Sequence, residues 1–330
     1  MKAELKTEPW WKRWVTGRGQ EEGASAEPLF EPDFSSLLES LTLIARKRFA
    51  GILQAERRSR VLGVGLEFAD HRPYVPGDDL RRIDWNIAGR TGRLMLRRFE
   101  EEEDLSITIV VDISSSMNAG APSRRRRGLR LAAALAYIGL VGLDRVGIEL
   151  VSDRVCARFP LVRGRGQVLR ILKFLDSAPE GGETDLQRAL KEVVSRAPRK
   201  GLVILITDGF DEEGFIKGLQ LLRHEGFDVN VIRLTDDRES DPAPLGDIRV
   251  VDAETGMEAQ LTLTPGLAKK LAVARREMSK RLQERALALG AGYQERPVQE
   301  GFVDSVLRTL HGGQVIGHRS AGRSGEKSWG

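Results

Sequence analysis

The chain of 330 residues is poor in cysteine, histidine and aromatic residues. It has one cysteine, Cys156, and four histidines, and its aromatic content is 6%. A single cysteine excludes an intrachain disulfide and is typical of a protein in a reducing compartment. No histidine has the spacing of a metal-ligand cluster or of a catalytic triad.

Long apolar runs and an excess of one charge are also missing. No apolar run approaches the ~20 residues that span a bilayer, and the start of the chain has lysines but no apolar segment of a secretory signal. Lys and Arg number 52 against 48 Asp and Glu, a net charge of +4, whereas nucleic-acid binders usually concentrate basic charge on one face. We therefore expect a cytoplasmic protein with no transmembrane segment and no nucleic-acid partner.

Three tryptophans stand near the start of the chain, at Trp10, Trp11 and Trp14, beside Lys12 and Arg13. Tryptophan next to basic residues is found at membrane interfaces, although this segment is too short to bind strongly by itself. The sequence leaves two alternatives open. One is contact with a membrane surface, and the other is a short arm that folds back onto the protein or contacts a partner.

What the sequence does contain is a buried strand that ends in oxygen ligands. Residues 105–111 form an apolar, β-branched run, the signature of a strand buried on both faces. Asp112, Ser114 and Ser116 follow at once, in Asp-x-Ser-x-Ser spacing. In open α/β sheets the carboxyl ends of the strands form the binding crevice, so we interpret this stretch as the nucleus of a Mg²⁺ site.

Strands and helices alternate along most of the chain, which predicts an α/β fold with a doubly wound, mostly parallel sheet. The short connection at residues 152–154 requires the strand after it to be antiparallel, at one edge of the sheet. The expected helices are 33–48, 123–143, 167–176, 186–195, 213–225, 265–289 and 302–310, and the expected strands are 92–99, 105–112, 146–151, 155–159, 201–207, 228–234, 247–252 and 258–263.

Composition and pattern divide the chain into five expected segments. A hairpin over 247–263 is free to pair with residues 60–100 rather than with the main sheet. The charged block from 57 to 104 keeps its aromatic residues, so we expect it to be folded and tied by Arg–carboxylate pairs. The segments are 1–33, flexible; 34–104, an N-terminal helix and a small β-rich accessory region; 105–240, the sheet domain with the metal site; 241–311, a β-ribbon and C-terminal helices packing on the other two; and 312–330, a disordered tail.

Two further loops bring oxygen ligands to the same edge of the predicted sheet. Thr184 lies in a glycine-rich loop before a helix, and Asp208 follows the buried strand 201–207. Each loop alone also fits a turn or a helix cap. Magnesium prefers hard oxygen donors. Few carboxylates and several hydroxyls would hold it without full neutralisation, so that an acid of a partner protein completes the site.

These motifs resemble two known families. Residues 105–235 resemble a von Willebrand factor type A domain with a metal-ion-dependent adhesion site, and the resemblance implies the metal ligands Asp112, Ser114, Ser116, Thr184 and Asp208. The block from Glu67 through Asp78-Asp79 to Trp85, together with the Asp112 motif, resembles the bacterial family known as domain of unknown function 58. That resemblance covers roughly residues 35–310 and implies a MoxR-type AAA+ ATPase, or its client, as partner.

We therefore predict a Mg²⁺-dependent protein-interaction module, with Mn²⁺ as an alternative ion, and not an enzyme. It would act as an adaptor or chaperone-like partner of the ATPase. One alternative is a metal-dependent hydrolase or phosphatase with Asp112 as nucleophile, although haloacid-dehalogenase-like phosphatases need a second Asp where this chain has Ser114. The other alternative is a structural scaffold with a vestigial metal site.

Overall fold

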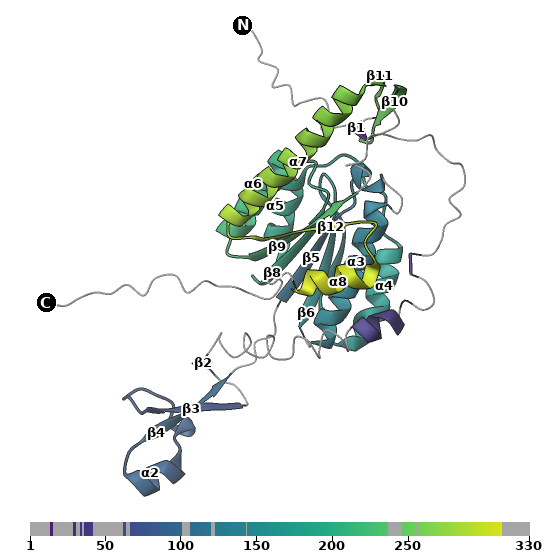
Figure 1. Cartoon of the computed structure of the whole chain (residues 1–330). Helices are drawn as coiled ribbons and strands as arrows, with labels where there is room; N and C mark the ends of the chain where they lie inside the picture. The colour runs from purple at the N-terminus through teal and green to yellow at the C-terminus, as the bar shows by residue number, and fades with distance from the viewer. Residues whose placement is uncertain are drawn as a thin grey trace, which may run out of the picture. The chain divides into compact units, whose positions relative to one another are not determined.

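The chain folds into two compact units, Met1–Ala45 with Leu105–Gly330, and Arg46–Asp104. The structure is a computed structural model, drawn in Figure 1. It describes residues 14–15, 29–30, 34, 36–41, 62–63, 67–100, 106–119, 123–142, 144–236, 246–254 and 256–311.

The larger unit is built on a six-stranded sheet. Five strands are parallel and the edge strand β7 is antiparallel, so the predicted α/β class with a mostly parallel sheet is confirmed. All six residues of β8 are buried, as are six of the seven in β5. The order is β12 (Gly292–Pro297), β9 (Asp228–Thr235), β8 (Leu202–Thr207), β5 (Ser106–Asp112), β6 (Arg145–Val151), β7 (Val155–Arg163).

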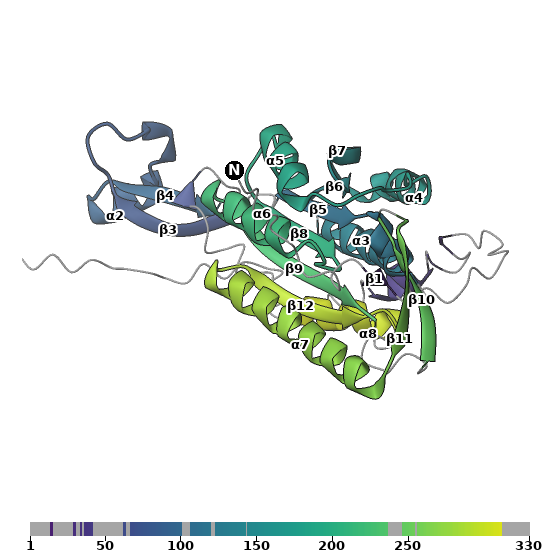
Figure 2. The same cartoon turned by 90° about the horizontal axis from the view of Figure 1, so that it is seen from above.

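Helices cover both faces of this sheet, as the two views in Figures 1 and 2 show. Val110 packs toward α5, α6 and α7 in one apolar cluster. Its neighbour Val111 faces α3, where it lies 3.5 Å from the position that a Cβ on Gly128 would take. The helices are α3 (Arg124–Val141), α4 (Val168–Asp176), α5 (Leu186–Arg196), α6 (Glu212–His224), α7 (Pro265–Ala288) and α8 (Phe302–His311).

Two strands of the larger unit differ from expectation. Strand β12 was not predicted, and it extends the main sheet beside β9. The ribbon of β10 (Gly246–Asp252) and β11 (Glu258–Leu263) forms as predicted. Its third strand is β1 (Trp14–Val15), however, and not a strand from residues 60–100. An edge strand of a ribbon accepts any extended segment that reaches it, so the sequence could not choose between these partners.

The smaller unit is a three-stranded antiparallel sheet in the order β2 (Leu62–Gly63), β4 (Met95–Glu100), β3 (Glu67–Pro73). Arg72 binds Asp78 through two hydrogen bonds of 2.8 and 2.6 Å, one of the ion pairs that we predicted. The strand expected over 92–99 begins only at Met95. Asp84 caps helix α2 (Trp85–Thr91), which ends at Gly92 with a φ of 68°.

The segment before residue 45 belongs to the larger unit, whereas we expected residues 34–104 to form one region. Within it, residues 34 and 36–41 are helical. The ring centre of Phe34 lies 5.6 Å from that of Phe302 in α8. This aromatic contact explains why the segment belongs to the larger unit. The backbone of Trp14 pairs with Asp252.

Several predictions fall wholly or mostly outside the described residues. They are the flexible segment 1–33, of which only 14–15 and 29–30 are described, the end of the first helix at 42–48, Trp10, Trp11 and the tail 312–330. Across the described helices, none combines the length and apolarity needed to cross a membrane.

Candidate metal centre

The carboxylate of Asp112 is fixed at the end of β5. Its Oδ1 accepts a hydrogen bond from the backbone N–H of Ser114 at 3.0 Å, and its Oδ2 accepts one from the hydroxyl of Thr207 at 2.7 Å. Asp112 has no exposed surface. The fold therefore holds a carboxylate inside the protein, where the sequence predicted the centre of a metal site.

The two serines after Asp112 place their hydroxyls side by side. The Oγ atoms of Ser114 and Ser116 are 3.1 Å apart, and both residues are buried. Octahedral Mg²⁺ holds its ligands at about 2.0–2.1 Å, so neighbouring ligand oxygens lie roughly 2.9 Å apart. The spacing of the two hydroxyls fits adjacent ligands of one ion.

The third loop brings Asp208 to the same edge of the sheet, directly after β8. One oxygen, Oδ1, accepts a hydrogen bond from the backbone N–H of Phe210 at 3.1 Å. The other, Oδ2, is buried and has no hydrogen-bond partner, and only 2% of the residue is exposed. A buried carboxylate oxygen without a partner is costly, and a bound cation would remove that cost.

Charge repulsion between the two acids supports this interpretation. Burial, and then the nearby charge of Asp208, raise the pKa of Asp112 to about 7, although hydrogen bonds from Ser114 and Thr207 oppose the rise. Within the described part of the chain, no three His, Cys, Asp or Glu side chains cluster closely enough to hold a metal. An ion at this place would therefore depend on the hydroxyls as well.

The glycine-rich loop is anchored beside the serines. The backbone N–H of Ser115 donates to the carbonyl of Gly182 at 2.9 Å. At Gly181 a Cβ would lie 1.8 Å from the carbonyl oxygen of Ile113. Only glycine permits so close an approach of the two backbones. The absence of a side chain at Gly181 thus brings the loop against the Asp112 motif.

Thr184, the fifth predicted ligand, binds an acid that the sequence did not single out. Its hydroxyl donates to Oε1 of Glu254 at 2.6 Å. Glu254 lies in the turn between β10 and β11, and the pattern around it indicated nothing more than a hairpin turn. No local sequence signal links a turn residue to a loop 70 positions earlier.

Four arginines, Arg124 to Arg127, begin α3. Arg124 is buried, and its Cζ lies 5.4 Å from the ring centre of Phe210. Its charge interacts with that of Asp208. Arg127 donates to the carbonyl of Glu300 at 2.6 Å. Two of these cations therefore face protein groups, and one of them adds positive charge near the candidate centre.

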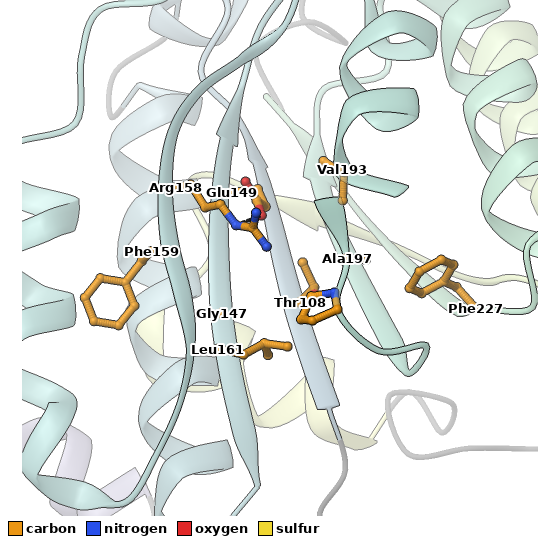
Figure 3. A pocket seen from close by; sticks show the side chains of 10 residues that line it. Thr108, Gly147, Glu149, Arg158, Phe159, Leu161, Val193, Ala197 and Phe227 are labelled. Atoms are coloured by element: carbon orange, nitrogen blue, oxygen red, sulfur yellow. Dashed lines mark ion pairs between the residues drawn. The ribbon is translucent and has the colours of Figure 1, made fainter. Parts of the chain in front are cut away.

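A small pocket lies away from this centre, on the β6–β7 side of the sheet (Figure 3). It contains an ion pair between the buried Glu149 and the exposed Arg158, with Nε and Oε1 2.9 Å apart. The other oxygen of Glu149, Oε2, is buried and has no hydrogen-bond partner. Arg158 also donates to the carbonyl of Arg196 at 3.0 Å, which ties β7 to the end of α5, so we interpret the pair as structural.

Comparisons with known proteins identify a family. A family model described as "Protein of unknown function DUF58" matches residues 70–285. Uncharacterized protein Rv1480 of Mycobacterium tuberculosis and uncharacterized protein Mb1516 of Mycobacterium bovis are each 29% identical to the chain over 244 residues, which is 72% of this chain and 76% of each relative.

Solved structures with similar folds include conserved hypothetical protein BatB from Bacteroides thetaiotaomicron. It is 18% identical with a TM-score of 0.39, over 63% of this chain and 97% of that one. An aerotolerance-related membrane protein from Bacteroides fragilis is 17% identical with a TM-score of 0.38, over 63% of this chain and 98% of that one.

Proposed function

The chain belongs to the DUF58 family, and from this premise we propose that it is a Mg²⁺-dependent protein-binding module. Asp112, Ser114, Ser116, Thr184 and Asp208 would hold the ion in a metal-ion-dependent adhesion site of the von Willebrand factor A type, and Mn²⁺ would be accepted in its place. An acidic residue of a partner would complete the coordination.

The observation that carries this proposal is the pairing of two buried acids. Asp208 has a buried oxygen without a partner, its charge raises the pKa of Asp112, and the hydroxyls of Ser114 and Ser116 lie beside them. Two carboxylates balance the two charges of Mg²⁺, and hydroxyl ligands add none, so any further anionic oxygen would take a coordination position otherwise filled by water. The ion would keep an affinity for one more anionic oxygen.

We propose a MoxR-type AAA+ ATPase, or a client of it, as the partner. This part depends on the resemblance of the Asp78-Asp79 block and the Asp112 motif to the family. The module would then act as an adaptor or a chaperone-like protein, which carries no catalytic step of its own.

The geometry of Asp112 favours binding over hydrolysis. A nucleophilic carboxylate needs a free oxygen aimed at its substrate, whereas both oxygens of Asp112 accept hydrogen bonds within the fold. A phosphatase of this kind also needs a general acid two residues after its nucleophile. In this chain that position is Ser114, whose hydroxyl lies against that of Ser116.

The test is calorimetric titration of the full chain with Mg²⁺ and Mn²⁺, followed by capture of the purified ATPase with metal or chelator. Asp112→Asn should abolish metal binding and metal-dependent capture. Asp176→Asn, an exposed acid at the end of α4, is the matched control and should behave as the unmodified chain.

Two results would overturn the proposal. One is equal capture of the ATPase in excess chelator, and the other is the absence of metal binding at millimolar concentration. Release of phosphate from p-nitrophenyl phosphate that disappears in Asp112→Asn would establish the hydrolase alternative instead.

A further inference from the structure

The charged block from Val75 to Trp85 belongs to the smaller unit, whereas the candidate metal centre lies in the larger one. Its first acid, Asp78, fixes a turn. The carboxylate accepts two hydrogen bonds from Arg72 and one from the backbone N–H of Val75 at 2.9 Å. The backbone N–H of Asp78 donates to the carbonyl of Val75 at 3.0 Å, and Gly77 has a φ of 104°. The turn is therefore closed from both sides.

The other acids of the block hold the backbone that follows. Asp79 caps the short 3₁₀ helix Leu80–Arg82. Asp84 caps α2, and its Oδ2 lies 3.0 Å from Nε2 of His71. The backbone N–H of Asp84 also donates to the carbonyl of Met95, the first residue of β4, at 2.8 Å. The acids thus serve the local fold, and they fix the positions of the residues between them.

The residues fixed in this way include exposed apolar ones. Four large apolar side chains of this region have 43–65% of their surface exposed, namely Val75, Leu80, Trp85 and Leu94. They make up half of the exposed large apolar side chains in the described part of the chain, so exposure of this kind is concentrated in one small unit.

Backbone hydrogen bonds bring three of these residues together. The backbone N–H of Tyr74 donates to the carbonyl of Leu94 at 2.9 Å, which places the following residue, Val75, beside this strand. Trp85 follows an acid that is bonded to the carbonyl of Met95, the neighbour of Leu94. Figure 1 shows α2, which begins with Trp85, at one end of the small sheet. The exposed apolar residues therefore gather at that end.

The fold of the smaller unit does not account for this exposure. Its buried apolar residues in this region are Ile83 and Leu96, which are 4% and 3% exposed and form a β-bridge with each other. Helix α2 has no buried residue among those described, so Trp85 contributes little to the core. A group of exposed apolar side chains on a small folded unit is typical of a surface that contacts another molecule.

The charge beside these apolar side chains is mainly positive. Arg81, Arg90 and Arg93 are exposed, and among the described residues none of them forms an ion pair with an acid. Between residues 75 and 94, Asp79 is the one exposed acid of the described positions. A molecule that covers this surface would therefore have to supply both apolar groups and negative charge.

We propose that this surface, the Trp85 patch, binds an acidic segment of another protein in which apolar side chains stand between the acids. The patch consists of Val75, Leu80, Arg81, Trp85, Arg90, Arg93 and Leu94. Binding here needs no metal ion, so the patch is a second contact beyond the one in the proposed function.

The composition of the patch favours a protein over a nucleic acid or a membrane. Tryptophan and arginine are enriched in protein interfaces and lysine is depleted, and residues 67–100 contain seven arginines and no lysine. Three of the four apolar side chains are aliphatic, whereas single-stranded nucleic acids stack on aromatic ones. The exposed carboxylate of Asp79, next to Leu80, would repel the phosphates of an anionic membrane.

The test is fluorescence anisotropy of a labelled peptide that repeats Asp-Ser-Asp-Leu-Asp-Phe, titrated with the full chain in excess chelator. It should bind at least about tenfold more tightly than a neutral peptide with Asn for each Asp. Trp85→Ala should weaken binding about tenfold or more, as expected for a buried tryptophan at an interface. Leu169→Ala is the matched control, because Leu169 is an exposed apolar residue of α4, and it should change nothing.

Two further variants separate the contributions of charge and folding. Arg90→Gln should weaken binding of the acidic peptide and leave that of the neutral peptide unchanged. Leu80→Ser should repeat the loss seen in Trp85→Ala. Both residues are exposed, so urea denaturation of each variant should match that of the unmodified chain, which excludes a folding defect.

Three results would overturn the inference. One is equal binding of the acidic peptide by the unmodified chain and Trp85→Ala, and another is equal binding of the acidic and neutral peptides. The third is tighter binding of phosphatidylcholine vesicles with about a third phosphatidylserine, or of a thymidine oligonucleotide, if Trp85→Ala abolishes it. The patch would then bind a lipid surface or a nucleic acid.

The metal dependence distinguishes this inference from the proposed function. If the acidic peptide binds only with Mg²⁺ and is lost in Asp112→Asn but not in Trp85→Ala, the metal centre binds the acid and the Trp85 patch is disproved. If binding persists in chelator and in Asp112→Asn but is lost in Trp85→Ala, the patch is established whether or not the larger unit binds an ion.

Discussion

At the scale of single residues, the two acids at the edge of the sheet oppose folding when no cation is present. Each is almost fully buried, and together they repel one another. A pKa raised to about 7 for Asp112 means that the folded state binds a proton more readily than the unfolded chain. The ionised acid therefore lowers the free energy of unfolding at neutral pH.

Replacement of Asp112 by Asn should stabilise the metal-free protein. Asn can accept the hydrogen bond from the backbone of Ser114 and removes one of the two repelling charges. We expect the free energy of unfolding at pH 7.5 in chelator to rise by about 1–3 kcal/mol. Urea denaturation measures it, with Asp176→Asn as control. A loss of stability would show that repulsion is not the dominant effect at this place.

Glu149 predicts a separate dependence of stability on pH. Burial raises its pKa to about 7 from the usual 4.5, although Arg158 and Arg196 oppose the rise. The stabilisation from protonated Glu149 is complete below about pH 4.5 and is lost as the pH rises through about 7. Between pH 5 and pH 8 the chain should lose up to roughly 3 kcal/mol relative to Glu149→Gln.

Urea denaturation of both proteins at the two pH values measures this difference. Glu213→Gln changes an exposed acid and should leave the pH dependence unaltered. An equal difference between the unmodified chain and Glu149→Gln at pH 5 and pH 8 would contradict the prediction.

The sequence pointed to some residues at this edge of the sheet and gave no sign of others. Asp112, Ser114, Ser116 and Asp208 could be named because each follows a strongly apolar strand, and the carboxyl ends of parallel strands meet. Glu254 could not be named, because its position depends on where a distant ribbon packs. The burial of Arg124 depends in the same way on a distant residue, Phe210, whose ring lies against its guanidinium.

At the scale of elements, the approach of the glycine-rich loop to the Asp112 motif depends on one missing side chain. Gly181→Ala places a Cβ 1.8 Å from a backbone oxygen, so one of the two loops must move. We expect a loss of about 3 kcal/mol or more in the free energy of unfolding, and weaker Mn²⁺ binding.

The neighbouring glycine provides the control. A Cβ on Gly182 would meet nothing within 4 Å, so Gly182→Ala should change stability by less than about 1 kcal/mol. Equal effects of the two substitutions, measured by denaturation, would mean that the loops adjust to each other freely.

Helices and strands with a regular pattern of apolar residues were predicted from the sequence, and those without such a pattern were missed. The strands β5 and β8 consist mainly of apolar residues, as expected of strands buried on both faces. Strand β12, Gly-Tyr-Gln-Glu-Arg-Pro, lies at an edge of the sheet and carries polar residues. Helix α2 is short and has no buried residues among those described, so it leaves no apolar period.

At the scale of the whole molecule, the division into two compact units predicts unfolding in more than one step. Differential scanning calorimetry should resolve two transitions. Mg²⁺ at 100 times its dissociation constant should stabilise only the larger unit, by about 2.7 kcal/mol. Asp112→Asn should remove that shift and leave the other transition unchanged. A single transition that moves as a whole would show that the units are coupled.

The pairing of β1 with β10 joins the start of the chain to the ribbon that carries Glu254. A force applied to the chain ahead of Trp14 would therefore act on this two-residue pairing and, through it, on the ribbon whose turn holds Glu254 against Thr184.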